Sequence, residues 1–379
     1  MVIVGFEVVV LGVLASLYVA GYEAWRFGKF QLFDCPSDVR SDQTFRIPLV
    51  DLSKYRHANS LSEKRKTADE IVNGFKEVGF IYLAGHRHPT EHGGQCPLNQ
   101  SADFFRLPTS VKDELAWKDP RANRGYVKIG RERTTQSTDA AVIAELRSKA
   151  PDTKESMEIG RDWDKTWRNP LAAGKRRPRI QADDAGFFSS MRQTCHEVHT
   201  VIMRAIALGL DLDEKFFDDK INEQYHNLRL LSYPAIKTSL LKKEGQARAG
   251  AHSDYGSLTL LFQDNIGGLQ VENPHTKHFQ HAKPIPGTIV VNAGDLLARW
   301  SNDTLRSTLH RVVAPLAESA NADESGMTPL RQSIAFFCNP NGGARISCLP
   351  SCHWPGNEAK YPPTTTEEYI VSRLSDTYN

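Results

Sequence analysis

The sequence predicts a mainly β protein with flanking helices, in which the strands of a β-sandwich or barrel form the core. Between residues 226 and 350, short apolar runs follow one another and are separated by Gly, Pro and Asn. Strands of this length and density are typical of sandwiches and barrels. Long amphipathic segments precede this region, and one more ends the chain. The composition, 40% hydrophobic and 24% charged, is that of a folded globular protein.

The first 25 residues are an apolar stretch that is long enough to span a bilayer. Glu7 interrupts it and no basic region precedes it, so it does not resemble a signal peptide. Three interpretations stay open: a membrane anchor, a helix lying against the domain, or an extension outside the working protein. We favour the anchor. Arg26 and Lys29 would then keep the rest of the chain on the cytoplasmic side.

Residues 45–225 are predicted to form a support region of helices and a few strands. The segments RIPLVDL (46–52) and FIYLAG (80–85) predict strands, and Ser62 is the expected N-cap of the helix between them. Residues 131–150 predict a polar insertion with a short helix. Residues 187–212 predict the longest helix. Its expected buried stripe is Phe188, Met191, Cys195, Val198, Ile202, Ala205 and Ile206.

The predicted core, residues 226–350, contains the strand-like runs LRLLSY, LTLLFQ, LQVE, TIVVNAG, HRVVAP and SIAFF. The tail, residues 351–379, ends in an amphipathic helix with Thr366 as its expected N-cap. No composition shift or internal repeat divides the region from 45 to 375, so we expect a single domain there.

Charge and cysteine content limit the partners and the compartment. The 47 Lys and Arg nearly balance the 45 Asp and Glu, so no nucleic-acid partner is implied. Six cysteines without a Cys-x-x-Cys pair indicate free thiols in a reducing compartment. We therefore expect a cytoplasmic protein, or one on the cytoplasmic face of a membrane if residues 1–25 are an anchor.

His252 and Asp254 are the first candidate metal ligands. They lie two residues apart ahead of an apolar run, and on an extended backbone this spacing puts both side chains on one face. His310, in TLHRVV, is the best candidate for a third ligand. Two imidazoles and one carboxylate on one side of an ion form the facial triad of non-haem Fe(II) oxygenases.

Arg331 and Ser333 repeat this spacing before the apolar run IAFF. A guanidinium beside a hydroxyl suits a carboxylate held at two points. The order His-x-Asp, His, Arg-x-Ser, with GGLQV after the first pair, resembles the iron(II)/2-oxoglutarate-dependent dioxygenases. It is most similar to the branch of isopenicillin N synthase and the plant flavonoid and gibberellin oxidases.

The resemblance implies a double-stranded β-helix, the cupin-like jelly-roll core of that family, with Fe(2+), 2-oxoglutarate and O2 as cofactor and co-substrates. Ascorbate is a candidate additional cofactor. By the same resemblance His252, Asp254 and His310 bind iron, and Arg331 and Ser333 hold the distal carboxylate of 2-oxoglutarate. Tyr233 is a further candidate for binding 2-oxoglutarate. Leu231 stands where the plant enzymes have Asn, which leaves fewer polar contacts to the co-substrate.

The function that the resemblance implies is oxidation of a C–H bond of a small organic substrate, by hydroxylation or desaturation, with release of succinate and CO2. We expect a monomer acting in secondary metabolism, on an organic acid or a pathway intermediate. Two alternatives stay open. One is an isopenicillin N synthase-like or ethylene-forming oxidase that uses no 2-oxoglutarate. The other is an inactive cupin-like binding protein.

Other residues are candidates for contacts near the site or are interpreted as lying outside it. The loop 165–184 is expected to carry substrate contacts. An apolar wall around the iron is expected from Leu258, Leu260, Leu269 and Phe336, while Tyr126 fits either the pocket or the core. The remaining histidines are interpreted as non-ligands: an exposed loop set at 86, 88 and 92, a half-exposed helical pair at 196 and 199, and surface residues at 275, 278 and 281.

Overall fold

The computed structural model describes residues 45–86, 97–119, 123–132, 134–135, 137, 140–161, 182–241, 246–316 and 326–378. Phe45–Asn379 forms one unit by its internal contacts. The apolar residues 1–25 and most of the loop 165–184 lie outside the described residues. Within the described ranges, no helix combines the length and the apolar character that crossing a bilayer requires.

Two sheets form the centre of the fold, and in the larger one only the edge pair β1–β2 is parallel. Its order is β1 (Leu49–Asp51), β2 (Phe80–Ala84), β11 (Ile289–Ala293), β8 (Leu258–Gln263), β14 (Arg331–Cys338), β5 (Asn227–Tyr233), β4 (Glu155–Ile159) and β3 (Gly125–Val127). The smaller sheet has the order β10 (Phe279–His281), β9 (Leu269–Glu272), β12 (His310–Val312) and β7 (Ala249–His252). Two short ribbons pair β13 (Met327–Thr328) with β6 (Ile236–Lys237), and β15 (Arg345–Ile346) with β16 (Thr364–Thr365).

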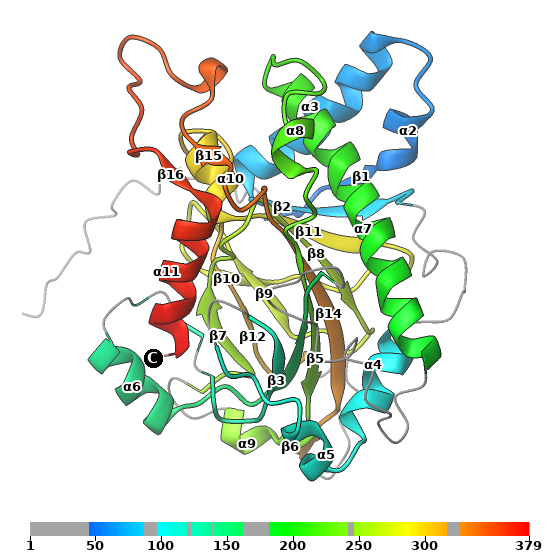
Figure 1. Ribbon diagram of the computed structural model, residues 1–379, viewed down its shortest axis with the longest axis vertical. Helices are drawn as coiled ribbons and strands as arrows, with labels where there is room; N and C mark the ends of the chain where they lie inside the picture. Colours follow the sequence, from blue (N-terminus) through cyan, green and yellow to red (C-terminus); the bar gives the residue numbers. More distant parts are fainter. Residues whose placement is uncertain are drawn as a thin grey trace, which may run out of the picture. The chain divides into compact units, whose positions relative to one another are not determined.

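Helices surround these sheets, and α11 lies across the strands from α7 (Figure 1). The helices are α2 (Leu52–Arg56), α3 (Leu61–Glu77), α4 (Pro97–Phe105), α5 (Thr109–Asp113), α6 (Ala140–Lys149), α7 (Ala182–Gly209), α8 (Asp218–Ile221), α9 (Thr238–Leu241), α10 (Asp295–Trp300) and α11 (Thr366–Tyr378), with a 3-10 turn at Pro350–Cys352. Helices α3 and α7 pack together and, with α4, against the larger sheet. The predicted stripe of α7 is buried, as expected.

Period-two alternation gives the larger sheet two buried faces. On β14, Ile334 and Phe336 join the core shared with the helices, whereas Ala335 joins a second core between the two sheets. On β5, Leu230 and Leu231 divide between the two cores in the same way. Residues with the parity of Ala335 and Leu231 therefore face the space between the sheets. Arg331 and Ser333 share the parity of Ala335.

The two predicted helix caps were displaced. Helix α3 is capped by Ser60, whose Oγ accepts the Glu63 N–H at 3.2 Å, and not by Ser62. At α11 the cap is Thr365, whose Oγ1 accepts the Glu368 N–H at 3.3 Å, while Glu368 accepts the Thr365 N–H at 3.0 Å. This reciprocal capping box explains the displacement, because it needs an acidic residue three positions after the cap.

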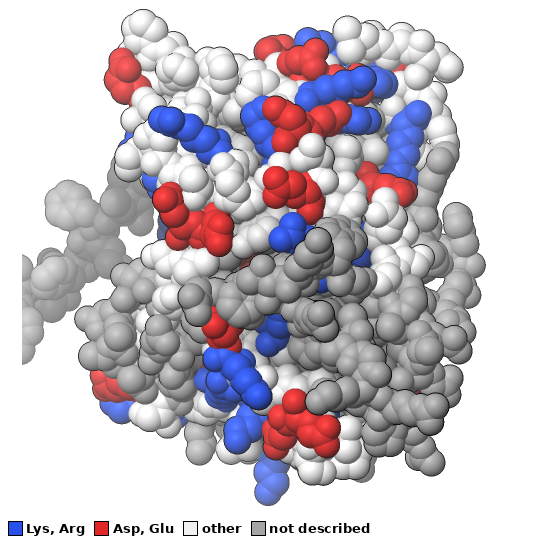
Figure 2. Space-filling view, in the orientation of Figure 1, with Lys and Arg blue, Asp and Glu red and all other residues white. Residues whose placement is uncertain are grey.

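The surface charge is mixed. On the face shown in Figure 2, Lys and Arg side chains alternate with Asp and Glu over the described residues. That face therefore presents no broad basic field of the kind that attracts a nucleic-acid backbone.

Candidate active site

The structure brings His252, Asp254 and His310 together between the two sheets. His252 ends β7 and lies opposite His310 on the antiparallel neighbour β12, so the two ring centroids are 4.3 Å apart. The Asp254 Oδ1 atom is 3.8 Å from Nε2 of His252 and 3.7 Å from Nε2 of His310. These separations exceed hydrogen-bond length and leave the three ligand atoms around one point. The predicted convergence of the three side chains is confirmed.

Neighbouring groups orient each of these side chains. Nδ1 of His252 donates to the Gly250 carbonyl at 2.8 Å, and Nδ1 of His310 donates to the Thr308 carbonyl at 3.2 Å. Both rings therefore direct an Nε2 lone pair toward Asp254. Two residues that the sequence did not single out hold the carboxylate. Its Oδ2 accepts from Thr259 Oγ1 at 2.6 Å and from Asn292 Nδ2 at 2.8 Å, which leaves Oδ1 for a cation.

The electrostatics of this group favour the metal-binding protonation states. Burial, together with the neighbouring His310, lowers the pKa of His252 to about 3. Burial pushes the pKa of Asp254 upward, but His310, His252 and the two hydrogen bonds hold it below its ordinary value. At neutral pH His252 is a neutral imidazole and Asp254 is a carboxylate. Two nitrogens and one oxygen with these charges fit a ferrous ion.

Arg331 lies in the same inter-sheet cavity and is completely buried. Its Nη1 donates to Ser333 Oγ at 3.2 Å, its Nη2 donates to Gln263 Oε1 at 3.1 Å, and its guanidinium lies 4.8 Å from the Tyr233 ring. Among the described residues no carboxylate lies within ion-pair distance of it, and its Nε has no hydrogen-bond partner. Asp264 interacts with it electrostatically at longer range, while the Asp264 oxygens accept the Ile266 and Gln332 N–H groups. A buried, unpaired guanidinium is costly, so the cavity is suited to an anionic ligand. The dicarboxylate 2-oxoglutarate fits this requirement.

The predicted apolar wall was largely wrong. Leu258, Leu260 and Phe336 point away from the cavity into the helix-side core, and only Leu269 lines it. The residues that line it on these strands are Thr259, Leu261, Ser333, Ala335 and Phe337. Leu231 lines it as well, so the position that is Asn in the plant enzymes is an apolar part of the wall here.

A second compartment also adjoins the triad. It shares His252, Asp254, Arg229 and Phe337 with the first cavity. The rest of its wall comes from separate segments: Asn123, Glu132, Thr134, Asn227, Ser253, Tyr255, Gly256, Asn339, and Ile370 and Leu374 of α11. Tyr126 is not among these residues. It is buried and donates from its hydroxyl to Glu155 at 2.6 Å, so it belongs to the core.

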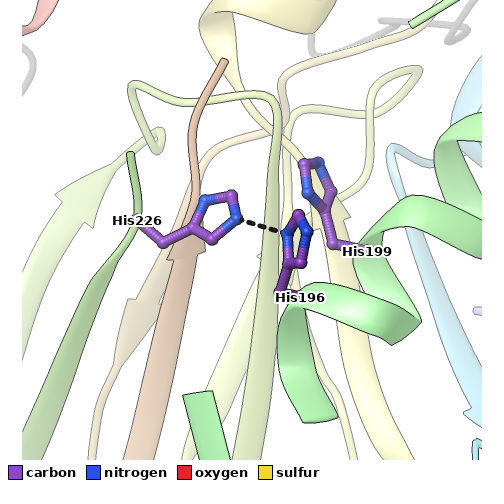
Figure 3. A group of neighbouring side chains, drawn as sticks. All are labelled: His196, His199 and His226. Carbon is purple, nitrogen blue, oxygen red and sulfur yellow. Dashed lines mark hydrogen bonds between the residues drawn. The ribbon is translucent and has the colours of Figure 1, made fainter. Parts of the chain in front are cut away.

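Three histidines form a second cluster (Figure 3). His196 and His199 of α7 meet His226, which directly precedes β5, and their ligand atoms lie within 4.8 Å of one another. The expectation that 196 and 199 are both half-exposed was wrong for His199, which is fully buried. His86 was also expected to be exposed and is buried, while 88 and 92 lie outside the described residues. His275 and His278 are exposed, as expected.

Hydrogen bonding makes the three-histidine cluster a poor metal site. Nδ1 of His226 accepts the Asn339 N–H at 3.1 Å, so the ring proton of neutral His226 is on Nε2, which donates to His196 Nδ1 at 3.0 Å. An imidazole that binds a metal through Nε2 needs its proton on Nδ1. His199 Nε2 contacts Ser257 Oγ at 3.2 Å. The cluster is therefore a hydrogen-bonded group of neutral rings.

This cluster predicts a loss of stability in acid. Burial, and then the neighbouring His196, lowers the pKa of His199 to about 3, and burial lowers the pKa of His226 well below its ordinary value. The unfolded chain binds protons on these rings below about pH 6.5, where the folded protein does not. The free energy of unfolding should therefore fall by at most about 1.4 kcal/mol per pH unit for each ring as the pH drops from 6.5 toward 3.

Urea unfolding of the metal-free protein between pH 7 and 5 tests this prediction. The His199→Gln variant should lose less stability over this interval than the unmodified protein. His275→Gln, which changes an exposed histidine, should follow the unmodified protein. Equal pH dependence for all three proteins would contradict a neutral His199.

Comparison with known proteins now assigns the class. A family model described as the 2OG-Fe(II) oxygenase superfamily matches residues 225–340. A second, described as non-haem dioxygenase in morphine synthesis N-terminal, matches residues 47–179. The chain belongs to the 2OG-Fe(II) oxygenase superfamily.

Individual relatives agree with this assignment. The 2-oxoglutarate-Fe(II) type oxidoreductase ppzD of Metarhizium majus is 33% identical, over 88% of this chain and 95% of its own length. The 2-oxoglutarate-dependent dioxygenase htyE of Aspergillus rugulosus is 34% identical, and the match covers 88% of this chain and 99% of its own length. A full-length Neurospora crassa protein, crystallised with alpha-KG and thymine, is 45% identical; the match covers 88% of this chain and 98% of that one, with a TM-score of 0.76.

These findings confirm the predicted family, the jelly-roll core and the enzyme class. The protein is an Fe(II)- and 2-oxoglutarate-dependent dioxygenase that oxidises a small organic molecule. The expectation of secondary metabolism stays a prediction. The relatives named as 2-oxoglutarate-dependent and the structure crystallised with alpha-KG favour 2-oxoglutarate dependence over the two alternatives.

Proposed function

We propose that His252, Asp254 and His310 hold the ferrous ion and that Arg331, Ser333 and Tyr233 hold the distal carboxylate of 2-oxoglutarate. The observation that carries the proposal is the single cavity onto which both groups open, with an unpaired buried guanidinium at one end. When bound, iron with 2-oxoglutarate and O2 supplies an oxidant that takes hydrogen from a C–H bond, while the co-substrate becomes succinate and CO2.

The protein's own contribution is placement and exclusion of water. Thr259 and Asn292 fix the Asp254 carboxylate, and the carbonyl groups of Gly250 and Thr308 fix the two imidazole rings. On the substrate side, Ile370 and Leu374 of α11 cover the compartment with apolar side chains. A substrate in this compartment meets the triad at His252 and Asp254, which line both cavities.

The substrate that we propose is a pyrimidine base such as thymine, oxidised at a carbon substituent of the ring. Two observations support this choice. The Neurospora crassa protein, at 45% identity, has been crystallised with thymine. In the present protein the compartment wall has a flat apolar surface, the Phe337 ring, with the Arg229 guanidinium 5.2 Å from its centroid. A small planar base can stack on such a ring while its polar edge contacts Arg229 and Asn227.

Anaerobic titration with Fe(II) and 2-oxoglutarate, followed by a screen for substrate-stimulated succinate release, tests the proposal. Thymine should stimulate succinate release with one oxidised product per turnover. Oxygen uptake with a substrate but without succinate would favour an oxidase that does not use 2-oxoglutarate. Succinate release stimulated by other small molecules, but not by any pyrimidine, would contradict the substrate assignment alone.

Phe337 provides a test of the stacking surface. The Phe337→Leu variant keeps an apolar side chain but removes the flat ring. We therefore expect the KM for thymine to rise about two- to twelvefold, since a stacked aromatic pair contributes roughly 0.5–1.5 kcal/mol beyond its buried area. The 2-oxoglutarate requirement should change less. Phe337→Tyr keeps the ring and should stay close to the unmodified enzyme in KM. If Phe337→Leu and Phe337→Tyr changed the KM for thymine equally, the result would argue against stacking.

A further inference from the structure

Among the described residues that line the compartment, Arg229 is the one Lys or Arg side chain, and acidic groups already lie beside it. It lies on β5 opposite Glu158 of β4, and its Nε contacts the Glu158 carboxylate directly. On its other side, its Nη1 is 3.5 Å from Oε1 of Glu132, which lines the same compartment. The Arg229 side chain is only 14% exposed.

The pairing continues behind the compartment wall. Lys154 Nζ is 3.3 Å from Oε2 of Glu132 and 3.0 Å from Oδ2 of Asp152. Acidic and basic side chains thus alternate along one buried row, which we call the charge ladder: Asp152, Lys154, Glu132, Arg229 and Glu158. Each cation in it lies between two carboxyl groups.

Glu132 is the carboxylate of the ladder that faces the substrate. Burial pushes its pKa upward, but Lys154 and Arg229 outweigh this effect and hold the pKa at about 2. It is therefore ionised at neutral pH. Among the described residues, the Lys and Arg side chains that line the co-substrate cavity are Arg331 and, from the charge ladder, Lys154 and Arg229. Bound Fe(II) and Arg331 together would carry three positive charges there, which Asp254 and the two carboxylates of 2-oxoglutarate would cancel.

We propose that Glu132 is a specificity-determining residue, which together with Glu158 neutralises Arg229 so that the compartment accepts an uncharged hydrogen-bonding ring and rejects its carboxylated analogue. This inference rests on the proposed pyrimidine function and deepens it. An incoming carboxylate would meet Glu132 within the same wall, and like charges in a desolvated site cost several kcal/mol. A neutral base avoids this repulsion and can still hydrogen-bond to Asn227 and Asn339. The organic acid considered from the sequence is thereby disfavoured as the substrate.

The test uses two ligands of the same shape, uracil-5-carboxamide and uracil-5-carboxylate. Each is titrated calorimetrically, without oxygen, into the full-length protein loaded with Fe(II) and 2-oxoglutarate. We expect the carboxylate to bind at least about thirtyfold more weakly than the carboxamide, since a like-charge penalty of about 2 kcal/mol corresponds to that factor. Equal binding of the two ligands would overturn the inference but not the pyrimidine assignment. Binding of neither would overturn both.

Glu132→Gln removes the charge and keeps the size of the side chain. It should reduce the ratio of the two dissociation constants by about tenfold, mainly because uracil-5-carboxylate binds more tightly. The matched control is Glu145→Gln, which removes an exposed carboxylate on α6 and should leave the difference unchanged. An unchanged difference in a folded Glu132→Gln protein would overturn the role of Glu132. If that variant does not fold, the unmodified protein still decides whether the compartment discriminates by charge.

Discussion

Replacing Asp254 with Ala is expected to abolish substrate-coupled succinate release and to weaken Fe(II) binding by at least about a hundredfold. Substitutions beside the ligands of metal sites already cost about ten- to a hundredfold in affinity, and Asp254 is the proposed ligand itself. It is also the only anion in the triad. Without it, His252 and His310 offer two neutral nitrogens, which hold a ferrous ion poorly.

Anaerobic Fe(II) titration and single-turnover succinate release measure this effect separately. The fold should survive, because Asp254 lies outside both apolar cores. A far-ultraviolet circular dichroism spectrum close to that of the unmodified protein would show this. Asp103→Ala on the exposed face of α4 is the matched control and should retain iron and activity. Retention of stoichiometric iron by Asp254→Ala would contradict the assignment of the triad.

The triad could be predicted because its geometry depends on local spacing and on one strand pairing. His252 and Asp254 are two residues apart at the end of β7, and β12 brings His310 opposite His252 in register. Arg331 and Ser333 were predictable for the same reason, since a spacing of two on β14 places both side chains on one face. Each of these inferences needed only the period of a strand.

The sequence did not show which residues of each strand face the cavity between the sheets. Where both sides of a sheet are buried, apolar residues occupy both parities, and the sequence does not show which parity faces the site. The run LTLLFQ illustrates this: Leu258 and Leu260 face the helices, whereas Thr259 faces the cavity and holds Asp254. One signal was present. Thr259 and Asn292 are isolated polar residues in apolar strands, and buried polar side chains of this kind almost always hydrogen-bond to another polar group.

The substrate compartment was also beyond sequence reasoning, because its wall is assembled from distant segments. Glu132 lies in the segment that was interpreted as a polar insertion, Arg229 in a core strand and Leu374 in the last helix. Their proximity follows from the tertiary fold. The three-histidine cluster has the same origin, since His226 reaches α7 from 27 positions beyond His199. Long-range contacts of this kind have no local pattern in the chain.

Replacing Arg331 with Met should raise the 2-oxoglutarate requirement by roughly 30- to 1000-fold while leaving Fe(II) binding intact, because truncating one partner of a buried charge pair costs about 2–4 kcal/mol. Met retains most of the side-chain volume. Without 2-oxoglutarate, the guanidinium is buried and has no ion-pair partner among the described residues. In the absence of 2-oxoglutarate, Arg331→Met should therefore have a thermal midpoint no lower than that of the unmodified protein.

Thermal unfolding of Arg331→Met shows whether Arg331 binds the carboxylate of 2-oxoglutarate or only supports the fold. In the unmodified protein, 2-oxoglutarate should raise the thermal midpoint as its concentration increases, because it binds only the folded state. In Arg331→Met this increase should disappear at the same concentrations. Gln263→Leu removes a partner of Arg331 and should shift 2-oxoglutarate binding in the same direction by a smaller factor. An Arg331→Met protein with normal iron binding and an unchanged 2-oxoglutarate requirement would place the co-substrate elsewhere, and the unpaired guanidinium would then need another anion.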